Sequence, residues 1–297
     1  MLFLTEGAGE LSLLRFVDAG LCEPLAFHAV YAGIAAAMEA GDPPVLVWGR
    51  ALPHLTVGAA QPVPLASRCP VPVVRRPLGG GAVWVDENQW NCVLVSPARP
   101  VMRRREDWVE HLLGPMRQVY AAFGVRVEAV SQDLWCGGRK IAGTGAGVIG
   151  EAAIMASSFL LRFPPERFVD CLRLPGVPRQ WVIDGLRETL TDWAAQAPLP
   201  AEPALKEAFR EALKHVWACE PVDAVPTAVE SARIADAYQD LQVEQLDLAG
   251  DAGALPAASQ LKLNARSRLT VLRTAGREVC ELIIDGRCIR RRALRCS

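Results

Sequence analysis

Three consecutive glycines, at 79–81, follow Arg75 and Arg76. Glycine has no Cβ and loses the most backbone entropy on folding, so a run of glycines is unfavourable inside a helix or a strand. The run therefore predicts a turn between two strands, VPVVRR (71–76) before it and GAVWV (81–85) after it. Glycine N–H groups can also approach an anion closely, and arginine adds a charged, forked donor. At this stage a plain bend and an anion-binding loop both fit.

The glycine run differs from two common phosphate-binding loops. A Walker A loop ends in Gly-Lys followed by Ser or Thr, whereas Ala-Val-Trp-Val follows these glycines. The dinucleotide-binding G-x-G-x-x-G motif opens a helix, whereas the residues after 81 alternate as in a strand. Any anion-binding role at this turn therefore belongs to a different class of site.

The composition indicates a globular chain with a large core. Of its 297 residues, 51% are hydrophobic and 22% charged, with a formal net charge of −1, which argues against a general nucleic-acid binder. The nine cysteines include no C-x-x-C pair, so we expect free thiols in a reducing compartment. The first residues lack a basic n-region, and no uncharged apolar run has the length of a membrane span. These features predict a cytoplasmic protein without a membrane partner.

Short apolar segments and amphipathic segments predict an α+β fold, a two-layer α/β arrangement with a central mixed β-sheet flanked by helices. Strands are predicted at 44–50, 54–60, 71–76, 81–85, 91–96, 125–130, 133–143 and 152–163. Helices are predicted at about 22–41, 106–124, 181–195 and 203–218. We expect a hairpin to join 81–85 to 91–96, and Gly137-Gly138 to form the turn of another.

The composition changes after residue 221. The following segment is acidic, rich in alanine and weakly patterned, and it leads to three predicted strands within 267–294. We therefore predict a core domain at 1–221 and a small C-terminal module at 222–297.

A second motif, DLWCGGRKIAGTGAG, spans 133–147. Lys140 lies there between an apolar strand and a glycine-rich segment, where a flexible point charge suits a carboxylate or phosphate that gains charge in a reaction. An edge-strand lysine that prevents aggregation is the competing interpretation. The four histidines are dispersed without partners at metal-ligand spacing, so no metal site is predicted.

Taken together, the two motifs carry a family resemblance. RR-x-x-GGGAV, followed about sixty residues later by D-L-x4-RK-I-A-G, resembles the lipoate–protein ligase and octanoyl transferase family, whose catalytic fold is shared with biotin–protein ligases. The resemblance covers about 20–220 and includes Gly58 and Gln61 at the positions of a Gly-x-x-Gln turn. It implies a lipoate-ligase-like catalytic domain.

The resemblance also implies an activity. Such a ligase uses ATP and Mg²⁺ to convert lipoate or octanoate into an acyl-adenylate, and then transfers the acyl group to a lysine of a lipoyl-domain carrier protein. Lys140 would be catalytic and hold the acyl carboxylate, and Arg76 would contact phosphate. The positions implied for ATP and substrate binding are Arg76, Gly80, Gly81, Ala82, Val83, Trp84, Asp86, Asn91, Asp133 and Gly143.

The chain departs from the family pattern at several positions. Leu78 and Val85 stand where the family usually has Ser and His, and a family histidine near 155–157 is missing. Two alternatives therefore stay open. One is an ATP-independent octanoyl or lipoyl transferase that forms a cysteine thioester, with Cys136 as the candidate nucleophile and acyl carrier protein as a partner. The other is a non-catalytic acyl-binding homologue.

Overall fold

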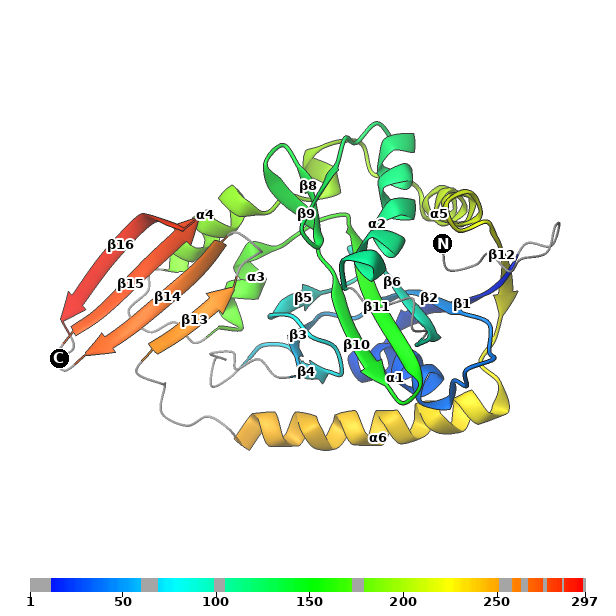
Figure 1. Ribbon diagram of the computed structural model, residues 1–297. Coiled ribbons are helices and arrows are strands. Elements are labelled where there is room, and N and C mark those ends of the chain that lie inside the picture. Colours follow the sequence, from blue (N-terminus) through cyan, green and yellow to red (C-terminus); the bar gives the residue numbers. More distant parts are fainter. Residues whose placement is uncertain are drawn as a thin grey trace.

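A computed structural model describes residues 12–59, 69–98, 105–172, 179–250, 258–262, 267–274, 277–284 and 286–295. The described residues form a six-stranded sheet, two three-stranded sheets and a four-stranded sheet, with helices packed around them (Figure 1). This arrangement confirms the predicted α+β class.

The six-stranded mixed sheet is the centre of the fold, with strand order β10-β11-β6-β2-β1-β12. Its strands are β1 (Ser12–Cys22), β2 (Val45–Ala51), β6 (Gln89–Pro97), β10 (Gly145–Ile149), β11 (Ala152–Leu160) and β12 (Cys219–Ala224). β1 runs parallel to β2 and β12, and the other neighbouring pairs are antiparallel. β1, β10 and β12 were not predicted; β10 occupies the glycine-rich segment that follows Lys140.

Helices cover both faces of this sheet. They are α1 (Pro24–Ala37), α2 (Arg105–Ala122) and α5 (Glu202–Trp217). In β6, Trp90, Cys92 and Leu94 pack into the cluster that contains α2 and α5 residues. Val93 and Val95 point the other way, into the cluster that contains α1. Burial on both faces explains why this strand has a nearly continuous apolar sequence.

The glycine run belongs to a small sheet beside the main one. The sheet has order β4-β3-β5 and contains β3 (His54–Gly58), β4 (Val73–Arg76) and β5 (Val83–Val85). The predicted hairpin between 81–85 and 91–96 is wrong, because β5 pairs with β3 whereas β6 pairs with β2 and β11. The turn after β5 instead carries the chain from the small sheet into the large one.

The lysine motif forms the other three-stranded sheet, β7 (Glu128–Val130), β8 (Asp133–Cys136) and β9 (Arg139–Ala142). Its predicted turn is confirmed, since β8 and β9 pair antiparallel around Gly137 and Gly138, whose φ angles are +56° and +75°. Glycine adopts this left-handed conformation without steric cost.

The weakly patterned segment after residue 221 contains a long helix, α6 (Ala228–Gly250). It runs along the outside of α1 (Figure 1). A Cβ on Gly33 of α1 would lie 2.3 Å from the backbone N of Ile234, so glycine permits the close approach of the two helices. The predicted boundary at 221 falls within β12 of the central sheet, and the two-domain division stays a prediction.

The C-terminal sheet is antiparallel and has four strands, β13 (Ala258–Lys262), β14 (Ser267–Thr274), β15 (Arg277–Ile284) and β16 (Arg287–Arg295). Between the main sheet and α5 the chain forms α3 (Pro165–Asp170), α4 (Arg179–Thr189) and the 3-10 turn η1 (Trp193–Ala195). The C-terminal sheet contacts α4, where a Cβ on Gly185 would lie 2.9 Å from Leu282 Cδ2 and Arg290 pairs with Glu188 at 2.5 Å.

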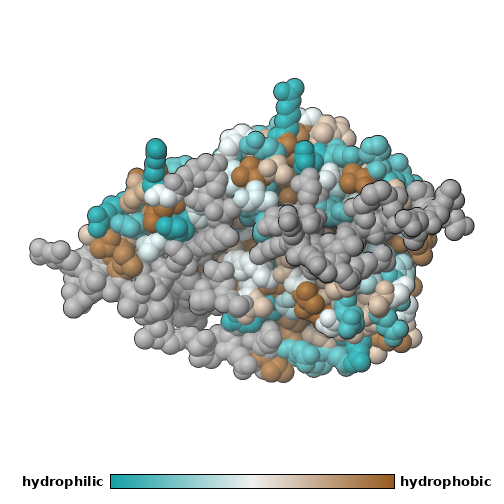
Figure 2. All heavy atoms as spheres, in the orientation of Figure 1, coloured by the Kyte–Doolittle hydropathy of each residue, from teal (hydrophilic) through white to brown (hydrophobic). Residues whose placement is uncertain are grey.

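The molecular surface is chemically mixed. On the face seen in Figure 2, hydrophobic residues stand in small separate groups among hydrophilic ones. Within the described residues, no helix combines the length and apolar character needed to cross a membrane.

Candidate functional site

A cavity of about 510 Å³ lies where the glycine run and the lysine motif meet. The two motifs are far apart in the sequence, but the fold brings them to the same cavity. The sequence-predicted residues that line it are Arg76, Gly80, Gly81, Ala82, Val83, Trp84, Asn91, Asp133, Lys140 and Gly143. Asp86 and Cys136 are not part of this lining.

Lys140 presents a cation to the cavity. Its Nζ lies 3.1 Å from Asp133 Oδ1, and its side chain is 22% exposed. Register across the β8–β9 hairpin and a backbone hydrogen bond from Thr191 N to Lys140 O, 2.8 Å long, hold the lysine backbone. An ammonium group has three N–H donors, so the ion pair with Asp133 leaves others for a ligand.

Gly143 makes room for the lysine side chain. A Cβ at this position would lie 2.5 Å from Lys140 Nζ and 2.7 Å from its Cε. The Gly143 carbonyl is fixed in turn, because Ser157 Oγ donates to it at 2.8 Å. The glycine therefore determines where the ammonium group lies.

The glycine run requires its residue type for a similar reason. Gly80 has a φ of +106°, and a Cβ there would lie 2.7 Å from Arg76 Nη2. A Cβ on Gly58 of β3 would lie 2.1 Å from Gly80 O. Side chains at either position would push the loop away from the arginine.

Arg76 is buried within this loop and is only 7% exposed. Its Nη2 donates to Gly79 O at 2.9 Å and to Gly81 O at 3.0 Å. Its Nη1 is buried and has no hydrogen-bond partner among the described residues. Burial lowers the pKa of Arg76, with a smaller opposing effect from Tyr31. Because an unsatisfied buried donor is costly, Nη1 indicates a ligand acceptor in the cavity.

Asp86 supports the cavity wall from behind. Its Oδ2 accepts a hydrogen bond from Trp84 Nε1 at 2.9 Å, and its Oδ1 accepts one from Asn88 N at 2.8 Å. The hydrogen bond from Asn88 N holds the Asp86 carboxylate, and the bond from Trp84 Nε1 lets that carboxylate orient the indole of Trp84, which lines the cavity. We therefore assign Asp86 a positioning role in place of the predicted ligand contact.

Cys136 does not have the surroundings of a nucleophile. It lies outside the cavity lining, and its Sγ donates to Gln196 Oε1 at 3.2 Å. Burial raises the pKa of the Cys136 thiol, although Arg139 lowers it in part. A nucleophilic thiol needs the opposite shift.

The two apolar departures from the family pattern are packed into the core. Leu78 and Val85 are buried and join the hydrophobic cluster that includes Val93 and residues of α1. Each also borders the cavity. They therefore give this wall an apolar surface.

The cavity wall also carries a group of polar residues that the sequence did not predict. His28 and Tyr31 of α1 line the cavity, as does Thr56 of β3. The Nε2 atoms of His28 and His54 lie 3.0 Å apart, although the residues looked dispersed in the sequence. The i, i+3 spacing of His28 and Tyr31 was a usable signal, because residues at this spacing share a helix face.

Comparison with known proteins gives a family match. The family described as lipoyl protein ligase A/B catalytic domain matches residues 34–213. No curated protein matches the sequence.

Solved structures share the fold at low sequence identity. A structure from an archaeal lipoylation system of Thermoplasma acidophilum, a bipartite lipoate protein ligase and its E2 lipoyl domain, has a TM-score of 0.71 and 14% identity and covers 82% of this chain and 99% of that chain. Lipoate-protein ligase A bound with ATP has a TM-score of 0.62 and 15% identity, covering 77% and 95%. LipL1 of P. falciparum in complex with lipoate has a TM-score of 0.63 and 12% identity, covering 87% and 80%.

Proposed function

Since this chain belongs to the lipoyl protein ligase A/B catalytic domain family, we propose that it attaches lipoate or octanoate to a lysine of a lipoyl-domain carrier protein. One observation carries the proposal. The cavity is lined by Lys140, whose ammonium pairs with Asp133, and by Arg76, whose Nη1 has no hydrogen-bond partner among the described residues. Two cationic groups in one partly apolar cavity suit an acid that becomes joined to a phosphate.

The first step is activation of the acyl carboxylate. A carboxylate oxygen attacks the α-phosphorus of ATP, the bond to the β-phosphate oxygen breaks, and pyrophosphate leaves. Lys140 would donate hydrogen bonds to the carboxylate and to the phosphoryl oxygens, where negative charge gathers. A pre-placed donor of this kind lowers a barrier by about 3–4 kcal/mol. Arg76 Nη1 would donate to an oxygen of the bound nucleotide.

The second step is acyl transfer to the carrier. The neutral ε-amine of the acceptor lysine attacks the acyl carbonyl carbon, AMP leaves, and the amine loses a proton to solvent. Lys140 remains beside the carbonyl and would stabilise the oxyanion of the tetrahedral intermediate. Lys140 is therefore the residue that we propose to act in both steps.

The proposed ATP brings Mg²⁺ bound to its phosphates. The described part of the chain has no cluster of three or more His, Cys, Asp or Glu that could hold a metal ion. Mg²⁺ commonly keeps several waters and binds through substrate phosphates and one or two carboxylates, which fits such a site. Asp133 is the cavity carboxylate that could contact one of these waters.

The apolar wall would bind the acyl chain. Trp84, Val85 and Leu78 line the cavity and are buried. Each methylene buried there contributes about 0.8 kcal/mol of binding. The cysteine-thioester alternative has less support, because no cysteine is among the described residues that line the cavity.

The test is ATP–pyrophosphate exchange with octanoate and with lipoate, followed by ATP-dependent acylation of a lipoyl domain. Lys140→Ala should abolish both reactions. The matched control is Lys214→Ala, because Lys214 pairs with Glu211 and Glu220 on the surface. Transfer from acyl carrier protein without ATP would support the transferase instead. Acyl binding without either reaction would support the non-catalytic homologue.

A further inference from the structure

A buried polar chain runs from the cavity wall on α1 to β3. Tyr31 Oη lies 2.9 Å from His28 Nδ1, and His28 Nε2 lies 3.0 Å from His54 Nε2. His54 Nδ1 then lies 2.8 Å from Leu52 O. All three side chains are buried, and Tyr31 and His28 border the cavity. These hydrogen bonds therefore connect a tyrosine of the cavity wall to a backbone carbonyl.

The two histidines in this hydrogen-bonded series, His28 and His54, are neutral at neutral pH. Burial lowers the pKa of His54 to about 4, against weaker opposing effects of Leu52 O and Asp86. Burial, assisted by His54 and the charge of Arg76, also holds the pKa of His28 well below its ordinary value. Each ring therefore carries one proton, on one of its two nitrogens.

The carbonyl fixes the direction of every hydrogen bond in the chain. A carbonyl can only accept, so His54 carries its proton on Nδ1 and donates to Leu52 O. His54 Nε2 then has a lone pair and accepts from His28 Nε2–H. His28 Nδ1 is consequently bare, and the Tyr31 hydroxyl donates its proton to it. The Tyr31 oxygen has only lone pairs left for the cavity.

Two unsatisfied polar atoms belong to the same part of the wall. Arg76 Nη1 and Thr56 Oγ1 are buried and have no hydrogen-bond partner among the described residues. Thr56 lies two residues after His54 on β3, so their side chains share a face of the strand. Burial raises the pKa of Tyr31, and the charge of Arg76 opposes this rise. The same charge adds to the burial that lowers the pKa of His28, so Arg76 acts electrostatically on both side chains.

A ligand group that satisfies this wall must accept a hydrogen bond from Arg76 and donate one to Tyr31. A carboxylate or phosphate oxygen only accepts, and an ammonium group only donates, whereas a hydroxyl does both. We propose that Tyr31 is a specificity-determining residue that, together with Arg76, forms a subsite for a neutral hydroxyl group of the bound ligand. The proposal rests on the proposed function, whose substrates can supply the hydroxyl from the nucleotide sugar or from a hydroxylated acyl chain.

Calorimetric binding to wild type and Tyr31→Phe tests the proposal. The ligand pairs are ATP against analogues lacking either sugar hydroxyl, and omega-hydroxyoctanoate against octanoate. For at least one of these ligand pairs, wild type should bind the ligand that has the hydroxyl about tenfold more tightly than the one that lacks it. Tyr31→Phe should reduce this ratio of affinities to near one. The pair that responds identifies the source. A ratio that is the same in both proteins for every pair overturns the proposal.

The tautomers give a second test that needs no variant. ¹⁵N NMR of the imidazoles at neutral pH should find the proton of His54 on Nδ1 and that of His28 on Nε2. A His28 protonated on Nδ1, or a charged ring, would mean that Tyr31 is not confined to accepting, and the proposal would be wrong. This measurement stays decisive if Tyr31→Phe does not fold.

The matched control is Tyr238→Phe on α6, which lies outside the cavity lining and should leave all binding ratios unchanged. The two proposals also fail separately. Acyl transfer by wild type with a ratio insensitive to Tyr31→Phe removes the hydroxyl subsite and keeps the ligase. An affinity ratio that Tyr31→Phe does reduce, in a protein that shows no acyl transfer, keeps the hydroxyl subsite and removes the ligase.

Discussion

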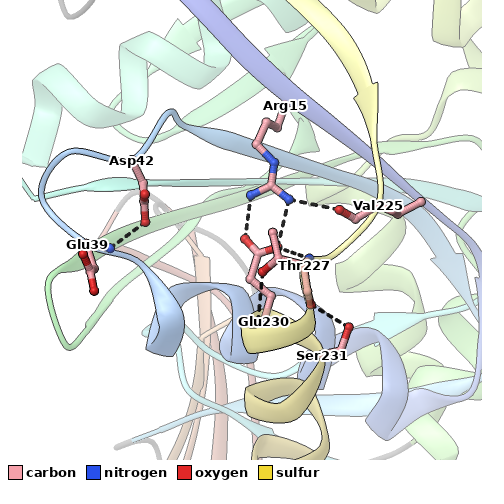
Figure 3. A network of polar contacts seen from close by, with 7 residues as sticks. All are labelled: Arg15, Glu39, Asp42, Val225, Thr227, Glu230 and Ser231. Atoms are coloured by element: carbon pink, nitrogen blue, oxygen red, sulfur yellow. Dashed lines mark hydrogen bonds and ion pairs between the residues drawn. The ribbon is translucent and has the colours of Figure 1, made fainter.

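Two polar networks in this protein differ in whether the protein alone completes them. The first pins the start of α6 to β1 (Figure 3). Arg15 Nη1 and Nη2 donate to the two carboxylate oxygens of Glu230 at 2.6 and 2.8 Å, and Nη2 also donates to Val225 O at 3.0 Å. Thr227 N donates to Glu230 Oε2, and Glu230 N donates to Thr227 Oγ1, which is a reciprocal capping box.

The second network lies on the cavity wall and is incomplete. Arg76 Nη2 donates to two glycine carbonyls, whereas Arg76 Nη1 and Thr56 Oγ1 have no hydrogen-bond partner in the part of the chain that the structure describes. Among the described residues, the Tyr31 hydroxyl has its hydrogen bond with His28 alone. Leaving a buried polar group unsatisfied costs about 1–3 kcal/mol. A network that the protein completes therefore stabilises the folded state, whereas an incomplete network gains free energy when a ligand binds and supplies the missing partners. Mutations in the first should therefore change stability, and mutations in the second should change binding and activity.

The largest expected effect comes from Gly143→Ala, on the incomplete side. The new Cβ would overlap the Lys140 ammonium, whose Nζ would lie only 2.5 Å away, and displace it from the cavity. We expect acyl transfer to fall by about 10²–10³-fold, equivalent to roughly 3–4 kcal/mol, with little change in melting temperature. Gly41→Ala is the matched control, because nothing lies within 4 Å of a Cβ there. Full activity in Gly143→Ala would mean that the position of Lys140 is not important for the reaction.

The next effect is acid destabilisation through His54. Its pKa falls from an ordinary 6.5 to about 4 in the fold because burial disfavours the charged ring. Between these values the unfolded chain binds a proton that the folded chain does not, so stability falls as pH drops from 6.5 towards 4. The shift corresponds to roughly 3 kcal/mol in total.

Urea unfolding across this pH range measures the effect of His54. His54→Asn retains a donor for Leu52 O but cannot be protonated, so its stability should depend less steeply on pH. The exposed His215 provides the control, His215→Asn, which should keep the wild-type slope. An unchanged slope in His54→Asn would show that this histidine does not titrate as its burial implies.

The sequence predicted the parts of the fold that depend on local pattern. The Gly137-Gly138 hairpin and the helix of α5 follow from turn chemistry and apolar spacing over a few residues. The pairing partner of β5 could not be predicted in this way. β5 pairs with β3, which lies earlier in the chain, and a local hairpin with the next strand was the competing possibility. The helix α6 was missed because its contact with Gly33 of α1 lies about two hundred residues away in the chain.

In the candidate site, too, local motifs predicted some features, whereas contacts between distant parts of the chain could not be predicted. The two motifs, taken together through the family resemblance, selected Lys140, Arg76, Gly80 and Gly81, and these residues line the cavity. The His28–His54 contact joins a helix to a strand, so no spacing rule could reveal it. Asp86 was predicted to bind a ligand, and that role stays a prediction; in the structure its carboxylate accepts a hydrogen bond from Trp84 Nε1 and the residue is not part of the cavity lining. Sequence motifs identify the residues of a site more readily than their roles.

A moderate effect is expected on the completed side, from Glu230→Ala. Burial raises the pKa of Glu230, but the hydrogen bonds from Arg15 and Thr227 together lower it by more than burial raises it. The pKa of Glu230 therefore lies below its ordinary value. Removing the carboxylate takes the ion pair from Arg15, which keeps its hydrogen bond to Val225 O, and removes the half of the capping box that Thr227 N forms. The expected cost is about 2 kcal/mol in unfolding free energy. Ligand affinities should stay at wild-type values. Glu211→Ala, at a surface ion pair, is the control that should change stability little.

The smallest expected effect comes from Asp86→Asn. Both carboxylate oxygens of Asp86 accept hydrogen bonds within the protein, yet one of those bonds holds Trp84 of the cavity wall, so this residue connects the two kinds of network. Asparagine keeps one acceptor and turns an amide donor toward either Trp84 Nε1 or Asn88 N, both of which are donors. Loss of one hydrogen bond should lower the unfolding free energy by about 1 kcal/mol. If Trp84 shifts as a result, octanoate affinity should fall in the same variant, as calorimetry would detect. A change in affinity without a change in stability would instead place Asp86 in direct contact with the ligand, as the family resemblance implied.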